Sequence, residues 1–170
     1  MFCGIAASVS KGAAFREETE RKKDFQKDRG KRRMKTSEIT AIFDADLARV
    51  WEAVTNNADC GWRSDLSGIE ITGENTFTEF ANNGFPTYFT ITEKRENELY
   101  ELDIDNKNFF GHWTGKFRAL EGGGTEVTFT ESLRVKNPLM RALAALFMNV
   151  RKFQLRYAED LSAKLKEDKN

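Results

Sequence analysis

Residues 139–166 read LMRALAALFMNVRKFQLRYAEDLSAKLK and contain the longest periodic apolar pattern in the chain. Pro138 stands just before them, where a helix can begin with proline because the first helical N–H needs no partner. Apolar residues then recur every three or four positions, at Leu139, Leu143, Leu146, Phe147, Val150, Phe153, Tyr157, Leu161 and Leu165. This spacing predicts one continuous helix from Leu139 to Lys166, roughly 40 Å long at the usual helical rise.

The region before this helix begins with a strand and a short helix. Residues alternate between apolar and polar from Glu38 to Phe43, which predicts a strand. Asp44 or Asp46 can then cap a helix over Leu47–Thr55. The polar segment 56–66 is irregular, and we predict that it holds a second short helical turn.

Six further strand patterns follow in close succession. Asn82-Asn83-Gly84 and Gly122-Gly123-Gly124 are turn signals between them, because asparagine and glycine tolerate positive φ. Each pattern is rich in β-branched and aromatic residues, and most alternate between apolar and polar positions. The predicted strands are Ile69–Thr72, Thr76–Ala81, Phe85–Lys94, Leu99–Asp105, Phe109–Leu120 and Thr125–Val135.

This order of elements predicts an α+β fold. A meander with one apolar face needs a cover, and the long C-terminal helix supplies it. We therefore predict a curved antiparallel sheet of about seven strands wrapped around that helix, with two short helices after the first strand. Curvature separates a sheet from its covering helix at one end, so we expect a cavity between them, where ligand sites commonly lie.

Charge is unevenly distributed along the chain. Residues 1–33 carry ten Lys/Arg and five Asp/Glu, whereas residues 34–170 carry the other 17 Lys/Arg and 22 Asp/Glu. We predict that 1–33 is a flexible charged extension and that 34–167 is the folded domain. An acidic domain argues against nucleic acid as its partner.

Few residues offer metal or redox chemistry. The chain has two cysteines, Cys3 and Cys60, and one histidine, His112. This set predicts neither a metal site nor a disulfide framework, and we expect no cofactor and a reducing, cytoplasmic location. No run of about 18 apolar residues is present, so we expect no transmembrane segment.

Three short stretches resemble a known superfamily. They are FDADLARVWEAVT at 43–55, GHWTG at 111–115 and VKNPL at 135–139. With the order of elements, they are similar to the START-like superfamily, also called SRPBCC, helix-grip or polyketide cyclase/dehydrase-like, and to its small bacterial members. The resemblance covers residues 34–167. It implies a cavity for hydrophobic or amphipathic molecules, as in lipid carriers, hormone and quinone binders and aromatic cyclases, and it implies no shared catalytic residues.

Glu131 is the polar residue most clearly in phase with an apolar strand face, that of Val127, Phe129 and Leu133. A carboxylate there must be paired, hydrogen-bonded or protonated, because an unpaired buried charge is costly. Its partner would be Arg63, Lys152, Arg156 or a ligand. The alternative is a solvated position near the edge of the sheet.

Other candidate residues depend on which way their side chains point. Arg63 can bind a carboxylate or phosphate on a ligand, or it can pair locally with Asp65. His112 alternates with Trp113, so it faces outward if Trp113 faces the cavity. The inward face of the strand that carries Glu79 cannot be decided from periodicity.

Function is predicted as binding or carriage of a lipid, quinone or aromatic compound. A cyclase or dehydrase using Glu131 as general acid or base and Arg63 to orient the substrate is one alternative, and a protein-interaction module is another. The start of the last helix is apolar nearly all round, and a loop or the second subunit of a homodimer would cover it. The predicted ligand-binding residues are Arg63, Phe89, Tyr100, Trp113, Phe117, Phe129, Glu131, Phe147 and Phe153.

Overall fold

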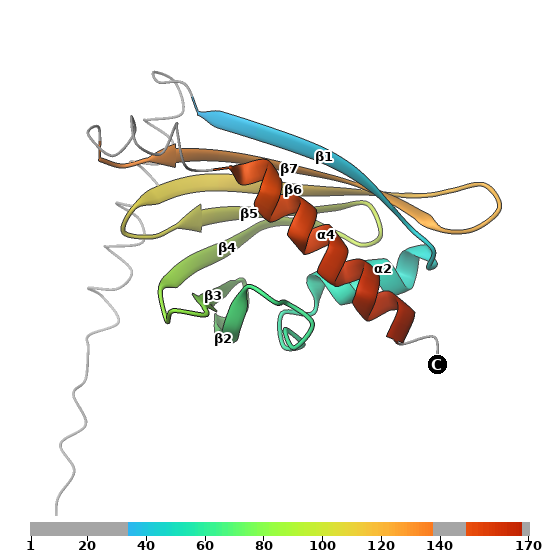
Figure 1. Cartoon of the computed structure of the whole chain (residues 1–170), viewed down its shortest axis with the longest axis horizontal. Helices are drawn as coiled ribbons and strands as arrows, with labels where there is room; N and C mark the ends of the chain where they lie inside the picture. Colours follow the sequence, from blue (N-terminus) through green and yellow to red (C-terminus); the bar gives the residue numbers. More distant parts are fainter. Residues whose placement is uncertain (1–33, 138–148, 168–170) are drawn as a thin grey trace, which may run out of the picture. The chain divides into compact units, whose positions relative to one another are not determined.

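The computed structural model describes residues 34–137 and 149–167. A strand and a short helix come first, and six strands and a C-terminal helix follow (Figure 1). The elements are β1 (Lys35–Phe43), α2 (Leu47–Thr55), β2 (Leu66–Gly73), β3 (Thr76–Ala81), β4 (Pro86–Arg95), β5 (Leu99–Asp105), β6 (Phe109–Ala119), β7 (Thr125–Val135) and α4 (Val150–Glu167).

The strands form one seven-stranded sheet in the order β1-β7-β6-β5-β4-β3-β2. All six neighbouring pairs are antiparallel. Strands β2 to β7 follow one another as hairpins, and β1 pairs with β7 at the other edge. Gly84 and Gly122–Gly124 have positive φ, which confirms the two glycine turns.

Alternation along each strand separates an inner face from an outer face. In β7, Val127 and Phe129 are buried, whereas the intervening residues are more exposed. Phe129 is opposite Gly115 of β6, and Glu131 is opposite Trp113, so these residues share the inner face. The predicted alternation is therefore present, and it carries Glu131 inward.

Helix α4 crosses the inner face of the sheet (Figure 1). Its Leu161 and Leu165 are buried in the main core. Gln154 is also buried, and its amide nitrogen donates to the backbone carbonyls of Ser37 and Phe129, at 3.1 and 3.2 Å. Satisfied hydrogen bonds make a buried amide tolerable, so Gln154 ties α4 to β1 and β7.

Helix α2 packs beside the C-terminal half of α4. Its N-cap is Asp46, whose carboxylate accepts a hydrogen bond from the Arg49 N–H at 3.0 Å. Arg49 in turn donates from Nη2 to the Leu165 carbonyl at 3.1 Å. Val50 and Trp51 are buried and join the main core, so α2 closes one end of the space under the sheet.

Two predicted features differ from the structure. Only one helix, α2, lies between β1 and β2. Residues 56–65 form turns, in which the Trp62 indole and the Arg63 N–H donate hydrogen bonds to backbone carbonyls. The C-terminal helix is described from Val150 to Glu167, and the predicted continuity from Leu139 is wrong at Asn149, which is not helical and whose side-chain oxygen accepts a hydrogen bond from the Lys152 N–H at 3.1 Å. The earlier part of the predicted helix, within 138–148, lies outside the described residues.

Several predictions are not tested by this structure. The charged extension 1–33 lies outside the described residues, and the homodimer and the absence of nucleic-acid binding stay predictions. No helix in the described part of the chain is long and apolar enough to cross a membrane.

Candidate functional site

A cavity of about 460 Å³ lies between the inner face of the sheet, helix α4 and the turns of residues 56–65. Side chains from α2, α4 and strands β2 to β7 line it, and most of its wall is apolar. The cavity follows from the curvature of the sheet, because α4 packs on β1 and bonds to β7 through Gln154, while the opposite edge bends away from it (Figure 1).

Aromatic rings build two walls of the cavity. Phe77 of β3 and Phe89 of β4 are cross-strand partners, and their rings stack parallel with centroids 4.9 Å apart. On the other wall, the Trp113 ring lies 5.7 Å from that of Phe129, and the Tyr157 ring lies edge-on to Phe129 at 5.4 Å. Such ring pairs add to the stability given by burial.

Gly115 allows Trp113 to lie along β6. A Cβ atom at Gly115 would come within 2.8 Å of the Trp113 ring and within 3.2 Å of the Phe117 ring. The absence of a side chain at position 115 therefore leaves the space that the Trp113 ring occupies.

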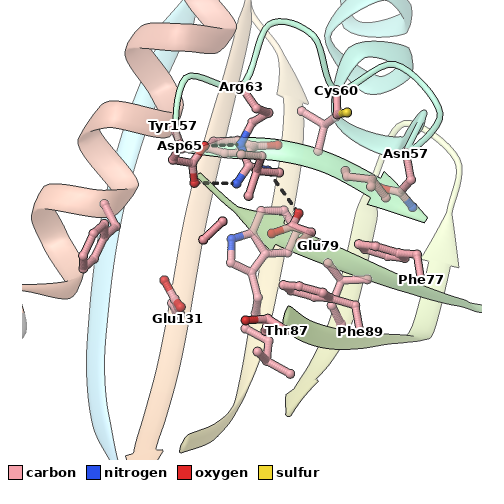
Figure 2. A pocket seen from close by; sticks show the side chains of 18 of the residues that line it. Asn57, Cys60, Arg63, Asp65, Phe77, Glu79, Thr87, Phe89, Glu131 and Tyr157 are labelled. Atoms are coloured by element: carbon pink, nitrogen blue, oxygen red, sulfur yellow. Dashed lines mark hydrogen bonds and ion pairs between the residues drawn. The ribbon is translucent and has the colours of Figure 1, made fainter. Parts of the chain in front are cut away.

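Arg63 forms the main ion-pair cluster of the site (Figure 2). Its Nε and Nη2 donate to the two carboxylate oxygens of Asp65, both at 2.9 Å, and its Nη1 donates to Glu79 at 3.2 Å. The guanidinium also lies 4.8 Å from the centroid of the Tyr157 ring. Two carboxylates and an aromatic face thus hold the charge of Arg63, whose side chain is only 13% exposed.

The charges in this cluster are strongly coupled. Burial disfavours the charge on Arg63, but the carboxylates of Glu79 and Asp65 outweigh it and raise its pKa. Burial also opposes ionisation of Asp65, yet the hydrogen bonds and charge of Arg63 keep the pKa of Asp65 low. For Glu79, burial raises the pKa, and its single bond to Arg63 offsets this only in part. Arg63 therefore stabilises the ionised form of Asp65 more than the ionised form of Glu79.

Glu131 lies across the cavity from this cluster, on β7. Its side chain lines the cavity, and no described residue forms a hydrogen bond or ion pair with its carboxylate (Figure 2). Burial raises the pKa of Glu131 to about 7; repulsion by Glu79 adds to this effect and attraction by Arg63 reduces it. At neutral pH the carboxyl group can thus be present with or without its proton.

Neutral polar groups complete the lining. Asn57 donates to the Tyr100 hydroxyl oxygen at 3.0 Å, and Asn106 donates to the Thr87 hydroxyl oxygen at 3.2 Å. All four of these residues line the cavity. They offer hydroxyl and amide groups to a ligand without adding charge.

The structure places most of the predicted ligand-binding residues in the cavity wall. Their ligand-binding role itself stays a prediction. Phe147 lies outside the described residues. The predicted residues that line the cavity are Arg63, Phe89, Tyr100, Trp113, Phe129, Glu131 and Phe153.

Phe117 does not line the cavity, and its predicted place there is corrected. Its ring meets the Trp51 ring edge-on, with centroids 5.0 Å apart, and it is buried in the main core. Phe117 has the same phase as Trp113, but it lies near the end of β6 that helix α2 covers. Strand phase alone therefore does not separate core positions from cavity positions.

His112 points to the outer face, as expected if Trp113 faces inward. Its Nδ1 lies 2.7 Å from Asp103, its cross-strand partner on β5, and its Nε2 lies 3.6 Å from Glu101. The side chain is absent from the cavity lining. Acid–base chemistry by this histidine within the cavity is thus incompatible with the geometry.

Sequence reasoning missed or left undecided several lining residues. Glu79 is opposite Thr87 in the β3–β4 register, and both point inward, which periodicity in β3 alone could not decide. Glu79 is in phase with Phe77, which the structure shows to be buried, but Phe80 on the other face left the sequence pattern undecided. Asn57 carried no such signal, because it lies in a turn that has no periodicity.

A metal centre finds no support in the described ranges. They contain no group of three or more His, Cys, Asp or Glu side chains placed to hold a metal ion.

Comparison with known proteins identifies the fold. No family model matches the sequence, and no curated protein matches it. A START superfamily protein from Mycobacterium smegmatis superposes with a TM-score of 0.64 at 14% identity, over 78% of this chain and 97% of its own. A conserved protein from Geobacillus kaustophilus gives a TM-score of 0.62 at 12% identity, over 78% and 96%.

A third solved structure is a putative protein in the dynemicin biosynthetic locus. It superposes with a TM-score of 0.59 at 14% identity, over 77% of this chain and 47% of that protein. At these identities the likeness concerns the fold alone. The sheet order, the covering helix and these superpositions together show that the chain has the START-like helix-grip fold.

Proposed function

We propose that this protein binds or carries a small amphipathic molecule, with an aromatic or aliphatic body, in the cavity between the sheet and α4. The observation that carries the proposal is the cavity itself, of about 460 Å³, with mostly apolar walls and a few converging polar groups. Small-molecule sites typically have this character and volumes of about 300–1,000 Å³. The START-like fold supports the same conclusion.

The aromatic walls suit a flat or apolar ligand body. The stacked pair of Phe77 and Phe89 and the cluster around Trp113 leave ring faces and edges on the cavity surface. Ring contacts are favourable with aromatic compounds, and they bury apolar area with any ligand. A lipid, a quinone or another aromatic compound would each use this wall.

The experiment is native mass spectrometry of the purified full-length protein, followed by solvent extraction of any bound compound. We expect a defined additional mass that belongs to an apolar or amphipathic compound. Ala53 of α2 lines the cavity, so Ala53→Phe should fill part of the volume and abolish the additional mass.

The matched control is Ala48→Phe, which adds the same ring to an exposed position of the same helix. This variant should keep the additional mass, and thermal melting should show that both variants are folded. If Ala53→Phe and Ala48→Phe retained the bound compound equally, the compound would bind elsewhere and the proposal would fail.

Acid–base catalysis is a second candidate function, and one observation favours it. Glu131 faces the cavity with a pKa raised to about 7, and a general acid or base works best with a pKa near the operating pH. A cyclase or dehydrase acting on an aromatic polyketide-like substrate would use such a group. Wild-type protein should then convert such a substrate while Glu131→Gln binds it without turnover. Equal turnover by both proteins would exclude this role.

A further inference from the structure

The charged groups that line the cavity are mostly acidic. Within the described chain, Arg63 is the only cationic side chain in the lining, and four carboxylates accompany it. One of the four, Asp59, pairs with Lys164 at 3.0 Å and is half-exposed. The remaining carboxylates, those of Asp65, Glu79 and Glu131, have Arg63 as the only lining cation among them.

Three of the five N–H donors of Arg63 are already used, at least one on each of its three nitrogens. Nε and Nη2 form the two-pronged contact with Asp65, and Nη1 bonds to Glu79. The Tyr157 ring covers one face of the guanidinium. A ligand carboxylate or phosphate would have only the two remaining N–H groups of Arg63, and it would lie beside the carboxylates of Asp65 and Glu79, whose like charge opposes its binding.

Glu131 presents the opposite situation. Its carboxyl group faces the cavity, and no described residue donates a hydrogen bond to it. The charge of Glu79 opposes ionisation of Glu131, and the attraction of Arg63 offsets this effect only in part. An acceptor that is desolvated and unpaired gains most from a ligand that donates a hydrogen bond, and gains more if the donor is positively charged.

We propose that the natural ligand carries a basic amine at its polar end, and that the ammonium group binds the carboxylate of Glu131 within the negative potential of Glu79. This inference rests on the proposed function, because it concerns the ligand of the same cavity. The aromatic walls hold the apolar body, and Asn57, Tyr100 and Thr87 supply neutral hydrogen-bonding groups. Fatty acids and phosphate-bearing lipids are disfavoured, since each adds an anion to an acidic cavity whose only described cation is already paired.

The proposal predicts a pH dependence. The titratable groups on the cavity lining are Asp59, Cys60, Arg63, Asp65, Glu79, Tyr100, Glu131 and Tyr157. Burial raises the pKa values of Tyr100 and Tyr157, so both stay neutral near pH 7, and Asp65 stays ionised. Glu131 is thus the group that exchanges its proton near neutrality, with Glu79 shifted in the same direction. Ammonium binding should strengthen as pH rises and these carboxyl groups ionise.

The test uses three naphthalene compounds that differ only in one substituent, which is an aminomethyl, a hydroxymethyl or a carboxymethyl group. Isothermal titration calorimetry on the full-length protein gives their dissociation constants. The aminomethyl compound should bind roughly tenfold more tightly than the carboxymethyl compound, the scale of one charge-assisted hydrogen bond. Between about pH 6 and about pH 8, its affinity should rise several-fold as Glu131 loses its proton.

Two variants assign the effect. Glu131→Gln should remove the preference for the amine and its pH dependence, and it should leave the hydroxymethyl compound bound within about twofold of wild type. Glu126→Gln is the matched control, because Glu126 lies on the same strand but pairs with Arg118 on the outer face. This control should behave as wild type with all three compounds.

The outcomes separate the two proposals. Tightest binding of the carboxymethyl compound would overturn the amine assignment and leave the binding function intact. An amine preference that persists in Glu131→Gln would overturn the role of Glu131. Failure of all three compounds to bind a folded protein would remove the proposed binding function itself, and the further inference with it.

Discussion

On the inner face of the sheet, Glu131 faces a cavity with no hydrogen-bond partner among the described residues, whereas on the outer face His112 pairs with Asp103 at 2.7 Å. Both residues lie on neighbouring strands, in β7 and β6, and both are acid–base groups. The inner group is partly buried and has no partner among the described residues, and the outer group has acidic partners and lies outside this cavity. The difference teaches that surroundings, more than residue type, decide where chemistry can occur.

The alternation of side chains along a strand places neighbouring residues on opposite faces of the sheet. His112 precedes Trp113, the residue that is opposite Glu131, so one step along β6 moves a side chain from the outer to the inner face. Helices α4 and α2 pack on the inner face. The outer face is not covered by any helix described for this chain (Figure 1).

The largest expected effect compares an aromatic side chain on each face. Phe129 is 1% exposed and contacts Phe43, Trp113 and Tyr157, so Phe129→Ala should lower the free energy of unfolding by about 4 kcal/mol. Tyr88 on the outer face is 48% exposed, and Tyr88→Ala should cost less than about 1 kcal/mol. Urea denaturation measures both, and equal losses would mean that the two faces are equally packed.

A charged residue on each face gives the next largest effect. Arg63→Met removes the partner of two carboxylates in the cavity and should destabilise the fold by about 3 kcal/mol. Arg118→Met breaks an exposed pair with Glu126 and should cost less than about 1 kcal/mol. Adding Glu79→Gln to Arg63→Met should restore part of the loss. Additive costs in the double variant would contradict the coupling of Arg63 with Glu79.

Glu131 should give the inner face a distinctive dependence of stability on pH. Its pKa is about 7 in the folded protein against 4.5 ordinarily, so the folded state holds a proton that the unfolded chain has released. Stability therefore falls as pH rises from about 4.5 to about 7, and Glu131→Gln should remove this part of the decline. Allowing for solvent in the cavity, the gain of the variant above about pH 7 is on the order of 2 kcal/mol.

The measurement is a series of denaturation curves across this pH range for the wild type, Glu131→Gln and the outer-face control Glu126→Gln. The control should follow the wild-type curve. If the stability of wild type and of Glu131→Gln changed with pH in the same way, Glu131 would be solvated in the folded protein. The inner and outer faces would then not differ in this property.

The smallest effect is expected for His112. Its pair with Asp103 lies on the outer face with both side chains partly exposed, so His112→Gln should change the free energy of unfolding by less than about 1 kcal/mol. Binding of the aminomethyl compound, followed by calorimetry, should be unchanged. A large loss of binding in this variant would place a functional site on the outer face.

Much of the architecture could be predicted because periodicity reports directly on it. The strand alternation, the glycine turns and the helix over β1 and β7 all leave regular patterns, and the inward direction of Glu131 followed from its phase with Phe129. The prediction of a second short helix was wrong. Residues 56–65 form turns, and the hydrogen bonds of these turns leave no regular spacing in the sequence. Phe117 was placed wrongly in the cavity, because the alternation along a strand shows which face a side chain is on and not where along the strand the cavity lies.

The sequence by itself determined which elements form and which way their residues point, because helix and strand periods are properties of the local chain. It also limited Glu131 to a few partners, of which a ligand was one. Only the tertiary structure decided that Arg63 pairs with Asp65 and Glu79, that Glu79 points inward, and that a cavity lies beside Glu131, which has no partner among the residues described. These features depend on the curvature of the sheet and on contacts between residues far apart in the chain, and such contacts leave no pattern along it.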